Sequence, residues 1–505
     1  DLAMRLMGEQ FVTGQSIDEA LKNSQPLVEK GFRYSYDMLG EAAMTDADAD
    51  RYYRDYETAI HAIGRASAGV GVYAGPGISV KLSALHPRYS RLQRERVLTE
   101  LLPRLTTLAR LAARYDIGFN IDAEEADRLE ISLDLLEALC QDPSLAGWKG
   151  IGFVVQAYQK RAPFVLDWII DLARRTNHRV MVRLVKGAYW DSEIKHAQVE
   201  GYKDFPVFTN KVHTDIAYIA CARKLLGAPD CIFPQFATHN AQTLASIYAM
   251  AGPDFTIERF EFQCLHGMGE ALYKEVVGPD KLNRPVRVYA PVGTHETLLA
   301  YLVRRLLENG ANSSLVKLIQ DQNVTIDELI ADPVSEFSPA APSRIRLPGA
   351  LFAPERTNSA GMNLTDEDVL RDLAQSLADE TPQFGEDGLA VVNPADQRDV
   401  VGHVAYATAE EVDGAVAAAQ AAFPAWSGLP PARRATCLMA AADRLEAETP
   451  RLLGLIIREA GKTFSNAVAE IREAVDFLRY YAVRITGEFD PAASVPLGPV
   501  PCLSP

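Results

Sequence analysis

The chain has 505 residues, which is too long for one compact core, so we expect two or more domains. The apolar share of 48% and the charged share of 23% are typical of a soluble globular protein, and the net charge of -16 argues against a nucleic-acid-binding surface over most of the chain. No apolar run approaches the roughly 20 residues that a membrane-spanning helix needs, and 6 cysteines without a CxxC pair predict a reducing compartment and no zinc site.

The first part of the chain predicts a (βα)8 barrel. Residues 1–30 predict a helical arm without a signal-peptide pattern. From residue 31 to residue 310, short β-rich runs that end in polar or small residues alternate with amphipathic helical stretches such as 94–115 and 162–176. This alternation predicts a parallel sheet, and eight units over about 280 residues predict a closed, TIM-like barrel. The runs are 32–39, 78–85, 117–125, 151–158, 180–190, 232–240, 260–268 and 286–293.

Polar residues follow or end most of these runs, where the catalytic groups of a (βα)8 barrel lie. Each has a purely structural interpretation: Asp122 could cap a helix, Gln156 could bond nearby backbone, and His239 could be a satisfied loop histidine. Together they predict a ring around a large polar ligand, because a buried polar group without a partner costs about 1–3 kcal/mol. The residues are Lys81, Asp122, Gln156, Arg183 with Lys186 and Tyr189, His239 with Asn240, Gln263, and Tyr289.

Common cofactor motifs are missing from the barrel region. The stretch "GVGVYAGPG" at 69–77 is rich in glycine but is not GxGxxG, and there is no P-loop. There is no HExxH sequence, and the carboxylates at the strand ends are too few for a two-metal site. We therefore expect no metal and a ligand held by side chains from many strands.

The last helix of this region, "AYLVRRLLENGANSSLV" at 300–316, contains two adjacent arginines. Leu302, Val303, Leu306 and Leu307 predict its apolar face. One interpretation of Arg304 and Arg305 is a solvated face with a single Arg–Glu pair. The other is a fork for an anionic substrate, because guanidinium groups bind carboxylates in a bidentate manner.

Four motifs decide between these interpretations. The segments "RLVKGAYWDSE" (183–193), "FATHN" (236–240), "FQCLHGMGE" (262–270) and "YLVRRLLENGANSS" (301–314) resemble, in the same order, the proline dehydrogenase domain of bifunctional PutA proteins. The resemblance covers residues 1 to about 325. It implies a distorted (βα)8 barrel, here 31–325, that binds FAD non-covalently and oxidises L-proline.

The resemblance also assigns substrate residues. It implies that Arg304, Arg305 and Lys81 bind the carboxylate of proline, that Asp122 holds the lysine in place, and that Glu308 orients Arg305. Three further residues, Tyr189, Leu265 and Tyr289, would form the wall around the proline ring.

A larger set would hold the flavin. Arg183 and Gln156 match the family's residues near N5 and the pyrimidine edge, and Gly187 also has a steric reason, since a backbone that approaches a ring has no room for a side chain. The implied cofactor-binding residues are Gln156, Arg183, Val185, Gly187, Ala188, Tyr189, Trp190, Thr209, Lys211, Thr238, His239, Asn240, Gln263 and Leu265.

The tail resembles the start of an aldehyde dehydrogenase domain. Residues 389–426, "REAGKT" (458–463) and "EAVDFLRYYA" (473–482) carry this resemblance, and 326–388 is expected to be a linker. The family's nicotinamide-binding sheet and catalytic cysteine do not occur in 389–505, and Cys502 precedes that region. We therefore expect an incomplete α/β segment without activity of its own, with NAD bound only by the missing part of a parent protein, which would convert glutamate semialdehyde to glutamate.

The family implies the product and the partners. The product is Δ1-pyrroline-5-carboxylate, and the electrons pass to a membrane quinone. We expect a cytoplasmic protein that, in its parent form, associates peripherally with the inner membrane, and nothing in this chain resembles a DNA-binding ribbon–helix–helix. Two alternatives stay open: a Schiff-base aldolase that uses Lys186, whose place after the fifth strand suits such a lysine, and a barrel that binds ligands without catalysis.

Overall fold

The computed structural model describes residues 11–294, 296–310, 325–338, 343–379, 388–488, 490 and 493–502, with backbone only at 308–310, 329, 378 and 379. The chain divides into two compact units, residues 1–193 with 206–344 and residues 194–205 with 345–505. The predicted linker 326–388 is divided between them. The two units are described separately.

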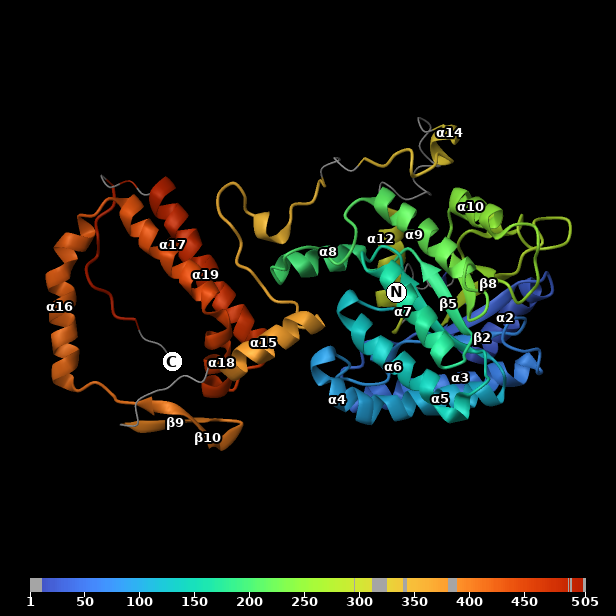
Figure 1. Ribbon diagram of the computed structural model, residues 1–505, viewed down its shortest axis with the longest axis horizontal. Coiled ribbons are helices and arrows are strands. Elements are labelled where there is room, and N and C mark those ends of the chain that lie inside the picture. Colours follow the sequence, from blue (N-terminus) through green and yellow to red (C-terminus); the bar gives the residue numbers. More distant parts are fainter. Residues whose placement is uncertain are drawn as a thin grey trace. The chain divides into compact units, whose positions relative to one another are not determined.

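The first unit is built on a closed barrel in which each strand pairs in parallel with the next and β8 closes on β1 (Figure 1). This confirms the predicted (βα)8 barrel. Its strands are β1 (Arg33–Met38), β2 (Gly77–Val80), β3 (Gly118–Ile121), β4 (Ile151–Gln156), β5 (Val180–Val185), β6 (Ile232–Ala237), β7 (Glu261–Leu265) and β8 (Val286–Val292).

Helices surround this barrel and account for its sequence pattern. The strands β2, β3 and β4 are buried along their whole length, as expected for parallel strands covered on both faces. Helix α3 begins with a capping box between Thr45 and Asp48. The helices of this unit are α2 (Ile17–Val28), α3 (Asp46–Ser67), α4 (Arg94–Arg96), α5 (Leu102–Arg114), α6 (Leu129–Gln141), α7 (Ala162–Arg175), α8 (Trp190–Val199, which crosses the unit boundary), α9 (Lys211–Leu226), α10 (Ala241–Ala251), α11 (Glu270–Tyr273), α12 (Leu299–Gly310) and α14 (Ile326–Leu329).

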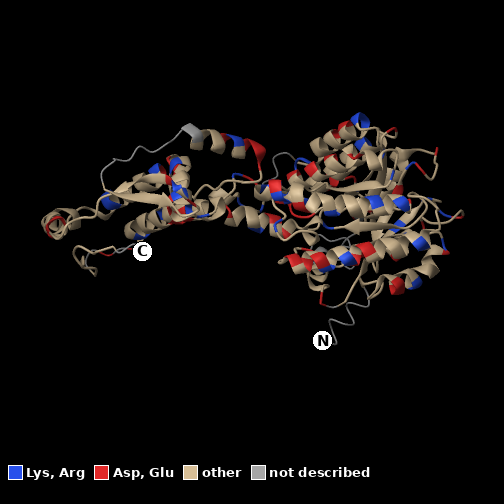
Figure 2. Ribbon diagram, turned by 90° about the horizontal axis from the view of Figure 1, so that it is seen from below, with Lys and Arg blue, Asp and Glu red and all other residues tan. Residues whose placement is uncertain are grey.

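Acidic and basic residues alternate along the outer helices of the barrel (Figure 2). Several form ion pairs between helices or loops, such as Arg174 with Asp230 at 2.9 Å and Arg110 with Asp142 at 2.8 Å. Exposed pairs of this kind contribute about 0–1 kcal/mol each. These pairs account for the charged outer faces of the helices, so the candidate functional residues are those inside the barrel.

The barrel interior also contains polar side chains, whereas the sequence pattern predicts them at the strand ends. Glu261 in β7 accepts hydrogen bonds from Arg287 Nε at 2.7 Å and from Gln235 Nε2 at 2.8 Å, and Asn120 donates to Gln235 at 2.8 Å. Burial alone would raise the pKa of Glu261, but Arg287 outweighs it and holds that pKa below its usual range. Side chains alternate along a strand, so this layer lies below the residues nearer the strand ends.

The second unit combines a β-hairpin with helices. Strands β9 (Leu389–Asn393) and β10 (Asp396–Val404) pair antiparallel. Helix α15 (Glu367–Asp379), within the predicted linker, contributes Leu373 to a core with Leu453 and Val475. The remaining helices are α16 (Ala409–Ser427), α17 (Pro431–Ala447), α18 (Thr449–Ala460) and α19 (Phe464–Gly487).

Candidate active site

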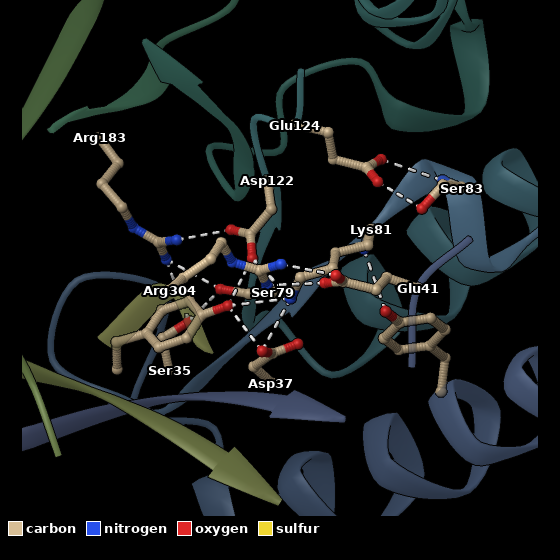
Figure 3. Close-up of polar contacts among 12 residues, drawn as sticks. Ser35, Asp37, Glu41, Ser79, Lys81, Ser83, Asp122, Glu124, Arg183 and Arg304 are labelled. Carbon is tan, nitrogen blue, oxygen red and sulfur yellow. Dashed lines mark hydrogen bonds and ion pairs between the residues drawn. The ribbon is translucent and has the colours of Figure 1, made fainter. Parts of the chain in front are cut away.

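Four side chains meet at the carboxyl end of the barrel (Figure 3). Lys81, directly after β2, donates from Nζ to Asp37 Oδ2 at 2.8 Å, to Tyr289 OH at 3.2 Å and to Asp122 Oδ2 at 3.4 Å. Asp37 is the next-to-last residue of β1, and Tyr289 lies in β8. The structure thus brings Lys81, Asp122 and Tyr289 together as expected from the sequence, but the shortest contact of Lys81 is with Asp37, which the sequence analysis missed.

Asp122 is the centre of the group. Its Oδ1 accepts a hydrogen bond from Arg183 Nη1 at 2.7 Å, and its Oδ2 accepts one from Tyr289 OH at 2.6 Å. Short contacts to a guanidinium and a hydroxyl favour the ionised carboxylate. Asp122 therefore positions Arg183 and Tyr289 as well as Lys81.

Arg183 is held from several sides. Its Nη2 donates to Ser79 Oγ at 2.9 Å and to Ser35 Oγ at 3.4 Å, and its guanidinium lies 5.1 Å from the centre of the Tyr289 ring. Its side chain is buried, with 3% of the residue exposed, yet Nε has no hydrogen-bond acceptor among the described residues. Because an unpaired buried donor costs about 1–3 kcal/mol, this N–H is suited to a bound acceptor.

The two arginines of α12 are both drawn inward. Arg304 forms a bidentate ion pair with Glu41, at 2.6 and 2.8 Å, and its guanidinium lies 5.0 Å from the centre of the Tyr189 ring. Arg305 is 7% exposed and its guanidinium lies 5.1 Å from the centre of the Tyr301 ring. The side chain of Glu308 lies outside the described residues.

The predicted apolar face of α12 is wrong for three of its four residues. Val303, Leu306 and Leu307 are 44%, 53% and 48% exposed, whereas Leu302 is buried. The buried face of the helix instead contains Tyr301, Leu302 and Arg305, and Leu298, directly before the helix, is also buried. Hydrophobicity alone placed the face about one residue, or roughly 100° of helix rotation, away from the observed one.

Glu41 shows what kind of group Arg304 binds. Burial alone would raise the pKa of Glu41, but the hydrogen bonds from Arg304 outweigh it, and the charge of Lys81 adds to the effect, so that this pKa lies below its usual range. Glu41 is therefore an anion, and its carboxylate shows that Arg304 can hold one.

The other expected cofactor residues lie around β4 to β7, and several already have protein partners. Gln156 Nε2 donates to the Glu124 backbone oxygen at 2.9 Å, and Gln263 Nε2 donates to Glu261 Oε1 at 2.9 Å, inside the barrel rather than above it. His239 Nε2 accepts the backbone N–H of Leu265 at 3.1 Å. Thr238 Oγ1 accepts the N–H of Asn240 at 3.1 Å, and Asn240 caps α10.

The stretch after β5 brings backbone and cations to the same end of the barrel. Gly187 has φ 138°, and a Cβ there would lie 2.5 Å from the Tyr158 ring, so only glycine fits. Trp190 Nε1 donates to the Phe208 oxygen at 2.8 Å. Lys211 Nζ donates to Asp215 Oδ2 at 2.8 Å. Of the remaining residues, Val185, Ala188 and Thr209 are half-buried.

Three acids of the site were missed from the sequence. Asp37 lies in the run 32–39, at the register of Ser79 in the next strand, so the alternation of side chains could have identified it. Glu124 follows β3, accepts the N–H of Ser83 at 3.0 Å, and has its pKa raised to about 7 by burial. Glu41 lies in a loop, and no signal in the sequence marks it.

Two general findings concern the described residues. No group of three or more His, Cys, Asp or Glu side chains within them is placed to hold a metal ion. Among the described helices, none has both the length and the apolar content required to cross a bilayer.

Comparison with known proteins follows the same division of the chain. The proline dehydrogenase family model matches residues 20–318, and the aldehyde dehydrogenase family model matches residues 381–496. The chain is 59% identical to the bifunctional protein PutA of Klebsiella aerogenes, over 100% of this chain and 40% of that protein, and 60% identical to that of Rhizobium meliloti, over 100% and 42%. It therefore spans about two fifths of these curated relatives.

The chain is also similar to a solved structure of a PutA protein. Proline utilization A of Bradyrhizobium japonicum superposes with a TM-score of 0.84 at 48% identity, over 95% of this chain and 47% of that one. The aldehyde dehydrogenase match confirms the predicted nature of the C-terminal segment.

Proposed function

The chain belongs to the proline dehydrogenase family, and on this premise we propose that it oxidises L-proline to Δ1-pyrroline-5-carboxylate with FAD, the first step of proline catabolism. The observation that carries the proposal is that Glu41 interacts with both Arg304 of α12 and Lys81, while Arg305 of the same helix is buried. Cationic side chains next to aromatic rings suit a small cyclic substrate, because the cations can bind its carboxylate and the rings can pack against its apolar part.

The residues present fit FAD. The buried N–H of Arg183 Nε without an acceptor among the described residues suits a flavin ring nitrogen, and the glycine backbone at Gly187 and the lysines around Asp215 suit the remainder of the cofactor. When bound, FAD supplies the acceptor for the hydride that leaves the proline ring carbon next to nitrogen. The predicted set from Gln156 to Leu265 is proposed to hold it.

The chain's own residues then have distinct roles. Arg304 and Arg305 bind the substrate carboxylate, with Arg304 exchanging Glu41 for it. Tyr189, Leu265 and Tyr289 enclose the ring and exclude water. Asp122 keeps Arg183 and Lys81 in place. We further propose a membrane quinone as the final electron acceptor, reached by peripheral association of the longer protein, as the resemblance implies.

The first prediction is that the purified protein is yellow and that L-proline under argon removes its visible flavin absorbance. The cation pair orients L-proline for hydride loss, so pyrrolidine, which lacks the carboxylate, should bleach the flavin far more slowly. Absorbance spectra with each compound measure this. A protein that stays colourless or unbleached after reconstitution with FAD would show that the proposed function is wrong.

The second prediction is that this chain does not reduce NAD with pyrroline-5-carboxylate. Its residues 389–505 contain no match to the family's catalytic cysteine or nicotinamide-binding sheet, although a longer protein is proposed to carry that activity. The formation of NADH, followed by absorbance with a complete aldehyde dehydrogenase as the positive control, measures this. NADH formed by the chain alone would contradict the assignment.

The alternative of a Schiff-base aldolase is not favoured. Lys186 is ion-paired with Asp215, whose own pKa lies below its usual range because Lys186 and Lys211 outweigh the effect of burial. A nucleophilic lysine needs a neutral amine, and an adjacent carboxylate stabilises the ammonium form.

A further inference from the structure

Three oxygen atoms at the end of the barrel lie too close together to share one proton. Tyr289 OH is 2.7 Å from Asp37 Oδ2 and 2.6 Å from Asp122 Oδ2. A tyrosine hydroxyl has a single hydrogen and can donate to only one of these oxygens. The other contact needs a second proton, because two unprotonated oxygens at this distance repel each other.

Lys81 does not supply that proton. Its ammonium contacts Asp37 Oδ2 at 2.8 Å, Tyr289 OH at 3.2 Å and Asp122 Oδ2 at 3.4 Å, so its hydrogens point at the three oxygens and do not lie on the lines between one oxygen and the next. The second proton must therefore sit on a carboxyl group, either that of Asp37 or that of Asp122.

Asp37 is the better holder. Asp122 has a guanidinium partner, Arg183, at 2.7 Å, which favours its ionised form. Asp37 is 0% exposed, and its Oδ1 has no hydrogen-bond partner among the described residues. A buried carboxylate with an unpaired oxygen is much more costly than a neutral carbonyl. Burial, supported by the charge of Asp122, raises the pKa of Asp37 despite the opposing effect of Lys81.

We propose that Asp37 is a neutral carboxylic acid at neutral pH and acts as a positioning residue that sets the charge of the substrate pocket. The proton completes one directed chain, in which Lys81 donates to Asp37, Asp37 donates to Tyr289, and Tyr289 donates to Asp122. Each donor then has an acceptor and no pair of oxygens is left without a hydrogen between them.

The charge of the pocket follows from this state. With Asp37 neutral, the two cations Lys81 and Arg183 face one anion, Asp122, and one positive charge remains for the carboxylate of a substrate. With Asp37 ionised, the two negative charges of Asp37 and Asp122 would balance the two positive charges of Lys81 and Arg183, and no net charge would remain. Loss of the proton at higher pH would therefore weaken anion binding. The titratable groups that act on Asp37 from the surrounding elements are Lys81, Asp122, Tyr289 and Tyr56. Arg183 contacts Asp122 and the Tyr289 ring, and Glu41, the partner of Arg304, interacts with Lys81.

Infrared spectroscopy tests the protonation state directly in the flavin-loaded protein. We expect a carbonyl band of an un-ionised carboxylic acid at pH 7 that shifts when aspartate is labelled with ¹³C at its side-chain carboxyl. Glu124 and Glu193, whose pKa values burial raises to about 7, also give such bands, but the aspartate label does not shift them. Absence of a label-sensitive band at pH 7 overturns the proposal, without need of any variant.

Two variants assign the band. Asp37→Asn should remove it, and Asp122→Asn should keep it. A band that survives in Asp37→Asn and is lost in Asp122→Asn places the proton on the wrong acid and also overturns the proposal. Glu124→Gln is the matched control, since it removes a different buried acid and should leave the label-sensitive band in place.

A binding measurement tests the charge role. Tetrahydrofuran-2-carboxylate has an ether oxygen in place of the amine, so its carboxyl is the only group in it that titrates. Its affinity for the protein should therefore depend on pH in the same way as the infrared band of Asp37. We expect a constant affinity where the band persists and a loss of up to about tenfold per pH unit where the band disappears. If the affinity changes with pH while the band stays constant, or the band disappears while the affinity stays constant, Asp37 does not set the charge of the pocket. The effect of Asp37 on substrate binding rests on the proposed function. The protonation of Asp37 does not, because the infrared spectrum is measured without turnover.

Discussion

Replacement of Arg305 by methionine is expected to lower kcat/KM for L-proline by about 10- to 150-fold, mainly through KM. Loss of one charged hydrogen bond to the substrate carboxylate costs about 1.5–3 kcal/mol, and about 1.4 kcal/mol corresponds to a tenfold change. Arg305 lies on the buried face of α12, and methionine retains much of its apolar stem, so flavin content should be unchanged. Steady-state kinetics with L-proline and with pyrrolidine measure the effect.

Pyrrolidine provides the decisive comparison, because it keeps the ring and the amine but not the carboxylate. The Arg305→Met variant should lose its advantage for L-proline and oxidise pyrrolidine as the wild type does. Arg174→Met is a matched control, since Arg174 forms an exposed pair with Asp230 and should not alter either reaction. Equal ratios of kcat/KM for the two substrates in wild type and variant would mean that Arg305 does not bind the carboxylate.

The effect of replacing Arg304 should depend on Glu41, with which its guanidinium forms a bidentate ion pair. Arg304→Met leaves Glu41 as an unpaired anion near the pocket, so the variant loses one attraction and gains one repulsion towards the substrate carboxylate. The double variant Arg304→Met with Glu41→Gln should therefore bind L-proline better than Arg304→Met alone. The part played by Glu41 was not foreseen from the sequence.

The barrel could be predicted from the sequence because each strand and helix has its own local pattern. Every one of the eight runs overlaps a strand, although the runs extend past the strand ends. A buried parallel strand needs a continuous run of β-forming residues, and the helix that follows needs an amphipathic one. The polar residues at the ends of these runs then predicted that Lys81, Asp122, Arg183 and Tyr289 lie at one end of the barrel, where the structure brings them together.

The remaining features depend on contacts between distant segments, which no local pattern contains. Glu41 pairs with Arg304 across 263 positions of the chain. The rotation of α12 that buries Arg305 and exposes Val303 and Leu306 goes with contacts to distant residues, since Arg304 meets Glu41 and the Tyr189 ring. The polar interior around Glu261 is likewise invisible in a single strand, because Arg287 and Gln235 come from neighbouring strands.

Asp122→Asn is expected to have the largest effect on turnover, a loss of about 100- to 4,000-fold in kcat. Removing one member of a buried ion pair costs about 3–5 kcal/mol, and Asp122 is the carboxylate that Arg183 contacts at 2.7 Å and Tyr289 at 2.6 Å. An asparagine keeps the shape but offers one oxygen in place of two and no charge. Arg183 and Lys81 then lose their fixed orientation, whereas the attraction of the pocket for an anion is retained or increased.

The effect of Asp122→Asn on turnover and its effect on anion binding can be measured separately. Single-turnover bleaching of the flavin should be slowed in Asp122→Asn, while tetrahydrofuran-2-carboxylate should bind at least as tightly as to the wild type, because the pocket gains one positive charge. Ser79→Ala is the matched control: it removes a neutral acceptor of Arg183 at 2.9 Å, worth about 0.5–1.5 kcal/mol, and should slow bleaching by about 2- to 10-fold at most. If Asp122→Asn is no slower than Ser79→Ala, the ionised carboxylate does not organise the site, and Arg183 is held by the serines and the Tyr289 ring instead.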